Sequence, residues 1–378
     1  MLDIKEYIDE NTDELFKLLK DLCLIPAPSH MEQERAKYCK AYLDGCGAEN
    51  VYIDDALNVI YPLNCKNSNE ITVIVAHTDT VFPDTDPLPY KEENGKIYSP
   101  GVGDDTACLA VLLLTAKYFT QKKLFPPKGV LFVCNSCEEG LGNLKGTRQI
   151  FKDFRGRISQ FISLDSGLSG VADNCAGSHR YEVEVKTEGG HSYQAFGNKN
   201  AINEISKLVS AIYSIDVPKK EGHKTTYNVG GISGGTSINT IAQSAKMLCE
   251  YRSDDKECLE IMQNKFEAIF ENARTDGVIV NVEKIGDRPC SNIDSEKIEN
   301  LKNIIVPIIE KEIKREVIFK ISSTDCNIPL SMGIPALCIG SYYGGGTHTR
   351  EEWIEKESLP IGLSVAIKVL LKISEVSL

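Results

Sequence analysis

The sequence has no surplus of basic residues and no apolar run long enough to cross a bilayer. Its 54 aspartates and glutamates outnumber its 42 lysines and arginines, and the net charge is -12. Nucleic acids and anionic membranes are bound by basic surfaces, so we expect neither as a partner. The acidic, amphipathic N-terminal stretch 1–22 lacks the basic and apolar regions of a signal peptide. We therefore expect a cytoplasmic protein.

The sequence also lacks a second C-x-x-C pair, an internal repeat and any low-complexity tract. Its 13 cysteines are scattered, and only Cys134 and Cys137 form a C-x-x-C motif. A zinc ribbon needs two such pairs. A thioredoxin-like redox motif opens a helix, whereas this one ends a strand-like apolar run. We interpret the cysteines as reduced residues of a protein in a reducing compartment.

What the sequence does contain is an α/β pattern in two blocks, within 378 residues that are enough for two domains. The first block alternates strand-like runs with a buried helix, and the pattern resumes after Asp294. Nearly continuous apolar strands separated by helices predict a mostly parallel sheet covered on both faces. The predicted strands are 71–77, 129–136, 161–167, 316–323 and 334–343, and the predicted helices are 105–119 and 295–314.

A different pattern separates these blocks. Residues 178–288 predict the element order β-α-β-β-α-β, with period-two strands and amphipathic helices. This order is typical of a ferredoxin-like α+β domain. We therefore expect one domain made of 1–177 and 289–378, with a second domain, 178–288, inserted into it.

Acidic and histidine side chains follow the ends of the predicted strands or precede the buried helix. The carboxyl ends of strands in an open α/β sheet are where ligands bind, so we expect these side chains to lie together. Carboxylate oxygens and imidazole nitrogens are ligands for hard and borderline divalent metals. The residues are His77, Asp79, Asp104, Asp105, Glu138, Glu139, Asp165 and His348.

Taken singly, these residues have simpler interpretations. A histidine at a strand end is more often structural than a ligand. Asp105 fits the N-cap of the following helix, and Asp104 fits a second acid near its positive end. Adjacent glutamates are usually solvated, but Glu138 and Glu139 follow a buried strand, where two carboxylates repel unless a cation holds one of them. The joint pattern favours a metal site.

The motifs resemble those of the co-catalytic zinc peptidases that include peptidase T, glutamate carboxypeptidase and acetylornithine deacetylase. The matching stretches run from about residue 70 to 355 and are VAHTDTV, SPGVGDDTA, CEEGLG, LDSG, EGGHSYQAFGNKNAI, GGTSINTIAQSA and GGGTHTREEW. The resemblance implies that 1–177 and 289–378 form the metal-binding catalytic domain and that 178–288 is a lid or dimerisation domain. It also implies two divalent metal ions, with zinc expected and cobalt or manganese as alternatives, and a homodimer formed through the inserted domain.

The resemblance assigns metal ligands by position. It implies that His77 and Asp165 hold one metal and that Glu139 and His348 hold the other. Asp104 is implied as the ligand that bridges the two metals.

It also assigns roles around the metals. Glu138 is implied as the general base that acts on a water between the metals. Asp79 is implied to accept the other ring N–H of His77. His191 resembles the histidine that stabilises the oxyanion, often from the partner subunit, and Asn239 and Arg252 match positions that contact substrate. For Arg252 a surface salt bridge is an equal alternative.

The expected function is hydrolysis of an amide bond in a small peptide. The stretches EEGLGNLKG and GGHSYQAFGNKNAI look closer to peptidase T-like aminopeptidases, which favours a di- or tripeptide with a free amino end. An N-acyl amino acid deacylase of the deacetylase or desuccinylase type, with the same metals and base, is the first alternative. A serine hydrolase is the second, because Ser233 lies in GISGG, which fits G-x-S-x-G. That motif requires a helix directly afterwards, where this sequence favours loop and strand.

Overall fold

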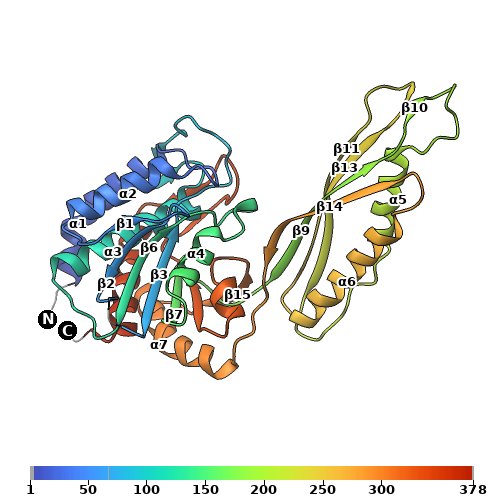
Figure 1. The fold of residues 1–378 in the computed structure, drawn as a ribbon. Coiled ribbons are helices and arrows are strands. Elements are labelled where there is room, and N and C mark those ends of the chain that lie inside the picture. Colours follow the sequence, from blue (N-terminus) through green and yellow to red (C-terminus); the bar gives the residue numbers. More distant parts are fainter. Residues whose placement is uncertain (1–3, 67, 377–378) are drawn as a thin grey trace. The chain divides into compact units, whose positions relative to one another are not determined.

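A computed structural model describes residues 4–66 and 68–376, which form two compact units (Figure 1). The larger unit is formed by the chain up to Cys175 and from Asn292 onward, and the inserted unit is Ala176–Ser291. The sequence placed these boundaries at 177 and 289.

The larger unit is built on an eight-stranded sheet whose central strands are parallel. The strand order is β1-β2-β6-β3-β7-β16-β8-β15. β3 pairs in parallel with β6 and β7, and β7 pairs in parallel with β16. The strands are β1 (Tyr52–Ile53), β2 (Val59–Leu63), β3 (Ile71–His77), β6 (Gly129–Asn135), β7 (Ile158–Leu164), β8 (Gly170–Cys175), β15 (Ile318–Ser322) and β16 (Ala336–Ile339). The prediction of a mostly parallel α/β sheet is confirmed.

Helices cover both faces of the central strands. All seven residues of β3 are buried, and because successive side chains point to opposite faces, both faces must be covered. α3 packs against β3 and β6, and α1 and α9 contact α3 in turn. The helices are α1 (Ile4–Cys23), α2 (Gln33–Gly45), α3 (Cys108–Gln121), α4 (Lys145–Asp153), α7 (Ser295–Ile313), α8 (Asn327–Ser331) and α9 (Ser358–Ile373). In the part of the chain that the structure describes, no helix has the length and apolar character needed to cross a membrane.

The start of α3 differs from the prediction. The helix begins at Cys108, and a π-helical turn, Val102–Ala107, precedes it. Asp104 and Asp105 have non-helical backbone angles in this turn, and α3 has no side-chain cap at its N-terminus. The N-cap interpretation of Asp105 is therefore wrong. Its carboxylate instead accepts the backbone N–H of His77 at 2.8 Å, which fixes the turn to the end of β3.

A small second sheet joins two distant segments of the larger unit. Its order is β17-β18-β5-β4, and β18 pairs antiparallel with β5. The strands are β4 (Lys91–Glu93), β5 (Lys96–Tyr98), β17 (Gly344–Gly345) and β18 (Trp353–Glu355). This pairing brings the segment that follows His348 beside the segment that leads to Asp104.

The inserted unit is an antiparallel sheet with two helices packed on it. The order of the long strands is β11-β13-β9-β14, and α5 and α6 pack against β9 and β13. The side chains of Asn200 and Asp255 cap the two helices. The elements are β9 (Gly177–Lys186), β10 (Gly190–His191), α5 (Ala201–Tyr213), β11 (Thr225–Gly234), β12 (Thr240–Ile241), β13 (Ser244–Ser253), α6 (Lys256–Asn272) and β14 (Ile279–Arg288). The ferredoxin-like prediction is confirmed.

Candidate active site

The acidic and imidazole groups of the larger unit gather at the carboxyl ends of parallel strands. His77 is the last residue of β3, Glu138 and Glu139 follow β6, and Asp165 follows β7. In the parallel register His77 pairs with Asn135, the last residue of β6, so these strands end at the same level. The sheet therefore places residues from three separate stretches of sequence around one point.

Asp104 lies between the two histidines of the site. Its Oδ1 is 3.0 Å from His77 Nε2, and its Oδ2 is 3.0 Å from His348 Nε2. The same His348 nitrogen is 3.2 Å from Glu139 Oε1. His77 is buried, whereas the side chain of His348 is 54% exposed. The two oxygens of Asp104 thus face two different imidazoles, which is the arrangement that a bridging carboxylate requires.

Two overlapping groups of side chains are close enough to share a cation. One group is His77, Asp104 and Glu139, and the other is His77, Glu138 and Asp165. In each group the candidate ligand atoms all lie within 4.8 Å of one another. Together with the contacts of His348, these groups bring all five expected ligands into one cluster. Glu138 lies within the same 4.8 Å of His77 in the second group as the expected ligands Asp104 and Glu139 do in the first, so its distance alone does not distinguish a base from a ligand.

The cluster raises the pKa of some of its carboxyl groups. Burial, followed by the charges of Asp104 and Glu138, raises the pKa of Glu139 to about 7. Burial and the charges of Asp104 and Asp105 raise the pKa of Asp165 well above its ordinary range. Each of these shifts is the cost of keeping negative charges close together away from water.

The imidazoles offset part of this negative charge. Burial opposes ionisation of Asp104, but the hydrogen bonds to His348 and His77 hold its pKa well below the ordinary value. Hydrogen bonds to Asp104 and Glu139 raise the pKa of His348 to about 10. Burial lowers the pKa of His77, yet the nearby Asp105, Asp104 and Asp79 raise it well above the ordinary value.

These observations fit a divalent-metal centre. The donor set is carboxylate oxygen and imidazole nitrogen. Buried Glu139 Oε1 pairs with His348 Nε2 across 3.2 Å, and it has no other polar partner among the described residues. A cation between these groups stabilises the ionised carboxylates that otherwise repel.

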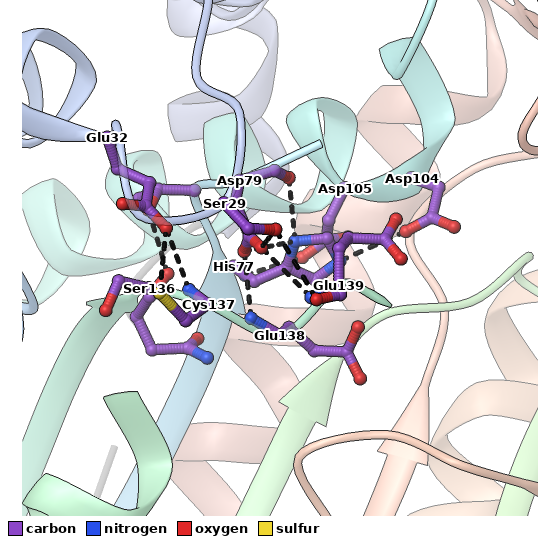
Figure 2. A network of polar contacts seen from close by, with 12 residues as sticks. Ser29, Glu32, His77, Asp79, Asp104, Asp105, Ser136, Cys137, Glu138 and Glu139 are labelled. Carbon is purple, nitrogen blue, oxygen red and sulfur yellow. Dashed lines mark hydrogen bonds and ion pairs between the residues drawn. The ribbon is translucent and has the colours of Figure 1, made fainter. Parts of the chain in front are cut away.

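Asp79 holds the turn that carries the two glutamates (Figure 2). Its Oδ1 accepts the N–H of Glu138 at 2.9 Å, and its Oδ2 accepts the N–H of Glu139 at 3.0 Å. The hydroxyl of Ser29 donates to the same Oδ2 at 2.6 Å. His77 Nδ1 lies 3.0 Å from the backbone carbonyl oxygen of Asp79 and 3.4 Å from its carboxylate. The carboxylate therefore orients the backbone of Glu138 and Glu139 more closely than it orients the His77 ring.

Glu32 and Asp325 are buried acids near the site that the sequence reasoning missed. Oε1 of Glu32 accepts the N–H of Cys137 at 3.0 Å, beside the two glutamates (Figure 2). The carboxylate of Asp325 accepts hydrogen bonds from the side chains of Thr147 at 2.5 Å and Asn135 at 2.6 Å. Burial raises the pKa of Asp325 to about 7. Each is a single acid in a loop without a spacing motif, so no local signal distinguishes it from a surface carboxylate.

In the inserted unit, the expected oxyanion-stabilising residue and one expected substrate contact lie in one short ribbon. β10 pairs with β12 so that His191 faces Thr240, and the N–H of Ser192 donates to the backbone carbonyl oxygen of Asn239 at 2.9 Å. His191 and Asn239 are both exposed. The ribbon therefore presents both side chains to solvent within this unit.

Arg252 lies apart from this ribbon, on β13. Its Nε and Nη2 donate to the two carboxylate oxygens of Glu250 at 2.8 and 3.0 Å. This is the salt bridge that the sequence left as an alternative to substrate contact.

The serine hydrolase alternative is wrong. Ser233 lies in β11, where it pairs with Lys246 of β13, and the next elements are the strands β12 and β13. A nucleophile elbow needs a sharp turn from a strand directly into a helix.

Comparison with known families agrees with the geometry of the site. The sequence model of peptidase family M20/M25/M40 matches residues 73–372, which is most of the chain. The chain belongs to this family. It is therefore a metal-dependent hydrolase, and members of its family generally bind two divalent metals.

Individual relatives of this M20/M25/M40 peptidase have different activities. A succinyl-diaminopimelate desuccinylase from Corynebacterium glutamicum is 24% identical over 354 residues, covering 90% of this chain and 92% of that protein. The solved structure of a tripeptidase from Staphylococcus aureus has a TM-score of 0.75 and 20% identity, covering 97% and 99%. The aminopeptidase PepT from Bacillus cereus has a TM-score of 0.73 and 20% identity, covering 96% and 99%. These structures share the fold of this family member.

Proposed function

We propose that this protein is a two-metal aminopeptidase that removes the first residue of di- or tripeptides. The observation that carries the proposal is the position of Asp104, whose two carboxylate oxygens face His77 and His348 at 3.0 Å each. In this proposal His77 and Asp165 hold one metal, Glu139 and His348 hold the other, and Asp104 bridges them. When bound, two divalent ions of this kind, with zinc the expected metal, polarise a carbonyl oxygen and lower the pKa of water.

Glu138 is the proposed general base. It is 5% exposed, and Asp79 fixes its backbone through the N–H of Glu138. Its carboxylate accepts a proton from the water that attacks the amide carbon. The same proton then passes to the nitrogen of the leaving amine, so Glu138 ends the cycle ionised, as it began.

His191 is the proposed donor to the oxygen of the tetrahedral intermediate. Its exposed position in the β10–β12 ribbon leaves the ring accessible to a ligand. We propose that it acts in a homodimer formed through the inserted unit, from either the same or the partner subunit. Asn239, which neighbours it in the ribbon, is the proposed contact to the substrate backbone.

The proposed preference for a free amino end is supported by sequence and charge. The stretches around Glu138 and His191 look closer to peptidase T-like aminopeptidases than to the deacetylases. Arg252, which matches a position that contacts substrate, is already bound by both oxygens of Glu250. A guanidinium engaged in this way is less available to an anionic acyl group such as a succinyl carboxylate.

An N-acyl amino acid deacylase is the second candidate. The observation that favours it is the desuccinylase from Corynebacterium glutamicum, to which 90% of this chain aligns. This reaction uses the same proposed metal ligands and the same base. The two candidates differ chiefly in what the site accepts on the carbonyl side of the scissile bond, which is an amino acid with a free amine in one case and an acyl group in the other.

A substrate panel separates the two candidates. The metal-free protein is supplied with zinc, cobalt or manganese and offered free di- and tripeptides, the same peptides with acetylated amino ends, and N-acetyl and N-succinyl amino acids. We expect cleavage of the free peptides and release of the first residue. Cleavage of the N-acyl amino acids alone contradicts the aminopeptidase proposal and supports the deacylase. The Glu138→Gln variant, purified identically, controls for contaminating peptidases.

A further inference from the structure

A buried glutamate outside the expected ligand set holds the loop that carries Asp104. Glu352 is 1% exposed and follows His348 closely in the sequence. Its Oε2 accepts the N–H of Gly101 at 2.8 Å. Its Oε1 accepts the N–H groups of Gly103 at 3.0 Å and Asp104 at 2.9 Å. One carboxylate therefore accepts three backbone donors from a single turn.

The turn formed by residues 101–104 is closely confined on its other sides. Gly101 has a φ of +72, and a Cβ at this position would lie 2.8 Å from Thr80 Cγ2. A Cβ at Gly103 would lie 2.7 Å from the ring of Tyr342. The two glycines allow the backbone to fit between these side chains, so its N–H groups reach the Glu352 carboxylate. The position of Asp104 then depends on where Glu352 lies.

Glu352 is also tied to the other side of the metal cluster. It directly precedes β18, which pairs with β5, and its backbone carbonyl oxygen accepts the N–H of Ser99 at 3.2 Å. The loop between β17 and β18 carries His348, whose Nε2 faces Asp104. Glu352 thus connects the segment of the bridging ligand with the segment of a terminal ligand.

We propose that Glu352 is a positioning residue that sets Asp104 relative to His348 and thereby fixes the spacing of the two metal sites. The inference rests on the metal assignments of the proposed function. Glu352 does not touch the metals or the substrate in this proposal. It acts through the three backbone N–H groups that it orients.

The chemistry of these contacts identifies the informative substitution. An ionised carboxylate is an acceptor at both oxygens, whereas an amide presents N–H donors on one side. Glu352→Gln keeps the side-chain shape, but its amide N–H group replaces one acceptor oxygen. It then faces one or two of the backbone N–H groups and cannot form a hydrogen bond with them. Glu351→Gln is the matched control, because Glu351 is the exposed neighbour and loses the same charge. Glu352→Asp keeps both acceptor oxygens at a shorter reach.

The test is zinc binding to the full-length, metal-free protein, measured by competition with a chelating dye and by metal content after dialysis. We expect zinc affinity of Glu352→Gln to fall about 10- to 100-fold, as for other residues that orient metal ligands. Glu351→Gln should bind like wild type, and Glu352→Asp should lie between. Thermal unfolding without metal is measured in parallel, since a purely structural role lowers the metal-free midpoint and leaves zinc affinity of the folded protein unchanged. If Glu352→Gln does not fold, Glu352→Asp carries the comparison.

The outcomes separate this inference from the proposed function. If wild type binds no divalent metal, the proposed function fails. If wild type binds zinc and Glu352→Gln binds it equally well, the positioning role is overturned while the proposed function stands. An equal loss in Glu351→Gln overturns it too, because the effect then reports general charge.

Discussion

The carboxylate of Asp79 accepts the backbone N–H of Glu139 across 3.0 Å. Asp79 follows β3, and Glu139 follows β6, so this bond fixes the ends of two neighbouring parallel strands to each other. A loop that carries catalytic groups needs such an anchor, because a loop without one samples many conformations. The sheet therefore positions the two glutamates, because their turn is hydrogen-bonded to the end of a neighbouring strand.

Asp79→Asn should lower kcat by about 10- to 100-fold, since outer partners of metal ligands have effects of this size. The amide places an N–H donor where the carboxylate accepts from Glu138 or Glu139. Ser29→Ala, which removes only the 2.6 Å hydroxyl contact to Asp79, should have a smaller effect. The measurement is steady-state kinetics on the best peptide of the panel, with metal content determined for each variant. Equal losses in both variants are inconsistent with an anchoring role for the carboxylate.

Glu138→Gln should lower kcat by about 100- to 10,000-fold, the range typical of a general base, with metal content unchanged. Glutamine has the same shape but cannot accept the proton of the attacking water. Because the candidate ligand atoms of Glu138, His77 and Asp165 lie within 4.8 Å of one another, metal content is the decisive measurement. Glu351→Gln provides the control for an exposed glutamate. Loss of one metal in Glu138→Gln argues that Glu138 is a ligand, and normal turnover removes it as the base.

His348→Ala should reduce the metal stoichiometry of the protein from two to one. The imidazole contacts Asp104 and Glu139, whereas His77 and Asp165 stay in place for the other metal. The remaining metal and the stoichiometry are measured by elemental analysis after dialysis against metal-free buffer. His223→Ala, an exposed histidine of the inserted unit, is the matched control. A stoichiometry that stays at two rules out His348 as a ligand.

The metal-free protein should become less stable as the pH rises from about 4.5 to 7. The pKa values of Glu139 and Glu352 are raised from the ordinary 4.5 to about 7, chiefly by burial. Between these values the folded state holds more protons than the unfolded state, so the free energy of unfolding falls with increasing pH. The pKa of His348, raised from 6.5 to about 10, extends the decline above pH 6.5. Asp104 has a lowered pKa and is ionised in both states throughout this range.

Urea denaturation with a chelator present, at intervals from pH 5 to 8, measures the slope of the free energy of unfolding against pH. Zinc should reverse or flatten it, because metal binding requires deprotonated ligands and strengthens over the same range. Glu139→Gln removes one of the titrating groups and should reduce the slope in the chelated protein. A flat profile for chelated wild type contradicts the idea that the carboxyl groups are forced together.

The elements of this protein that leave a local pattern could be predicted from its sequence. Continuous apolar runs predicted the central strands of the larger unit, because strands buried on both faces have apolar residues at nearly every position. Period-two alternation predicted the strands of the inserted unit, because only one of their faces is buried. The helix predicted at 295–314 is observed as Ser295–Ile313. Strand ends also indicated which acids and histidines would lie together, since parallel strands end at one edge of the sheet. The catalytic roles of those residues stay predictions.

The contacts that hold the site in place could not be predicted, because they form between segments that meet only in the folded chain. Asp105 was interpreted as a helix cap, yet its carboxylate accepts the N–H of His77. Glu352 looks like a surface charge beside Glu351, yet it is buried against the turn of Asp104. The physical reason is the same in both cases. A backbone N–H donates to any carboxylate that the fold brings near it, and partners so far apart in the chain leave no periodic signal in the sequence.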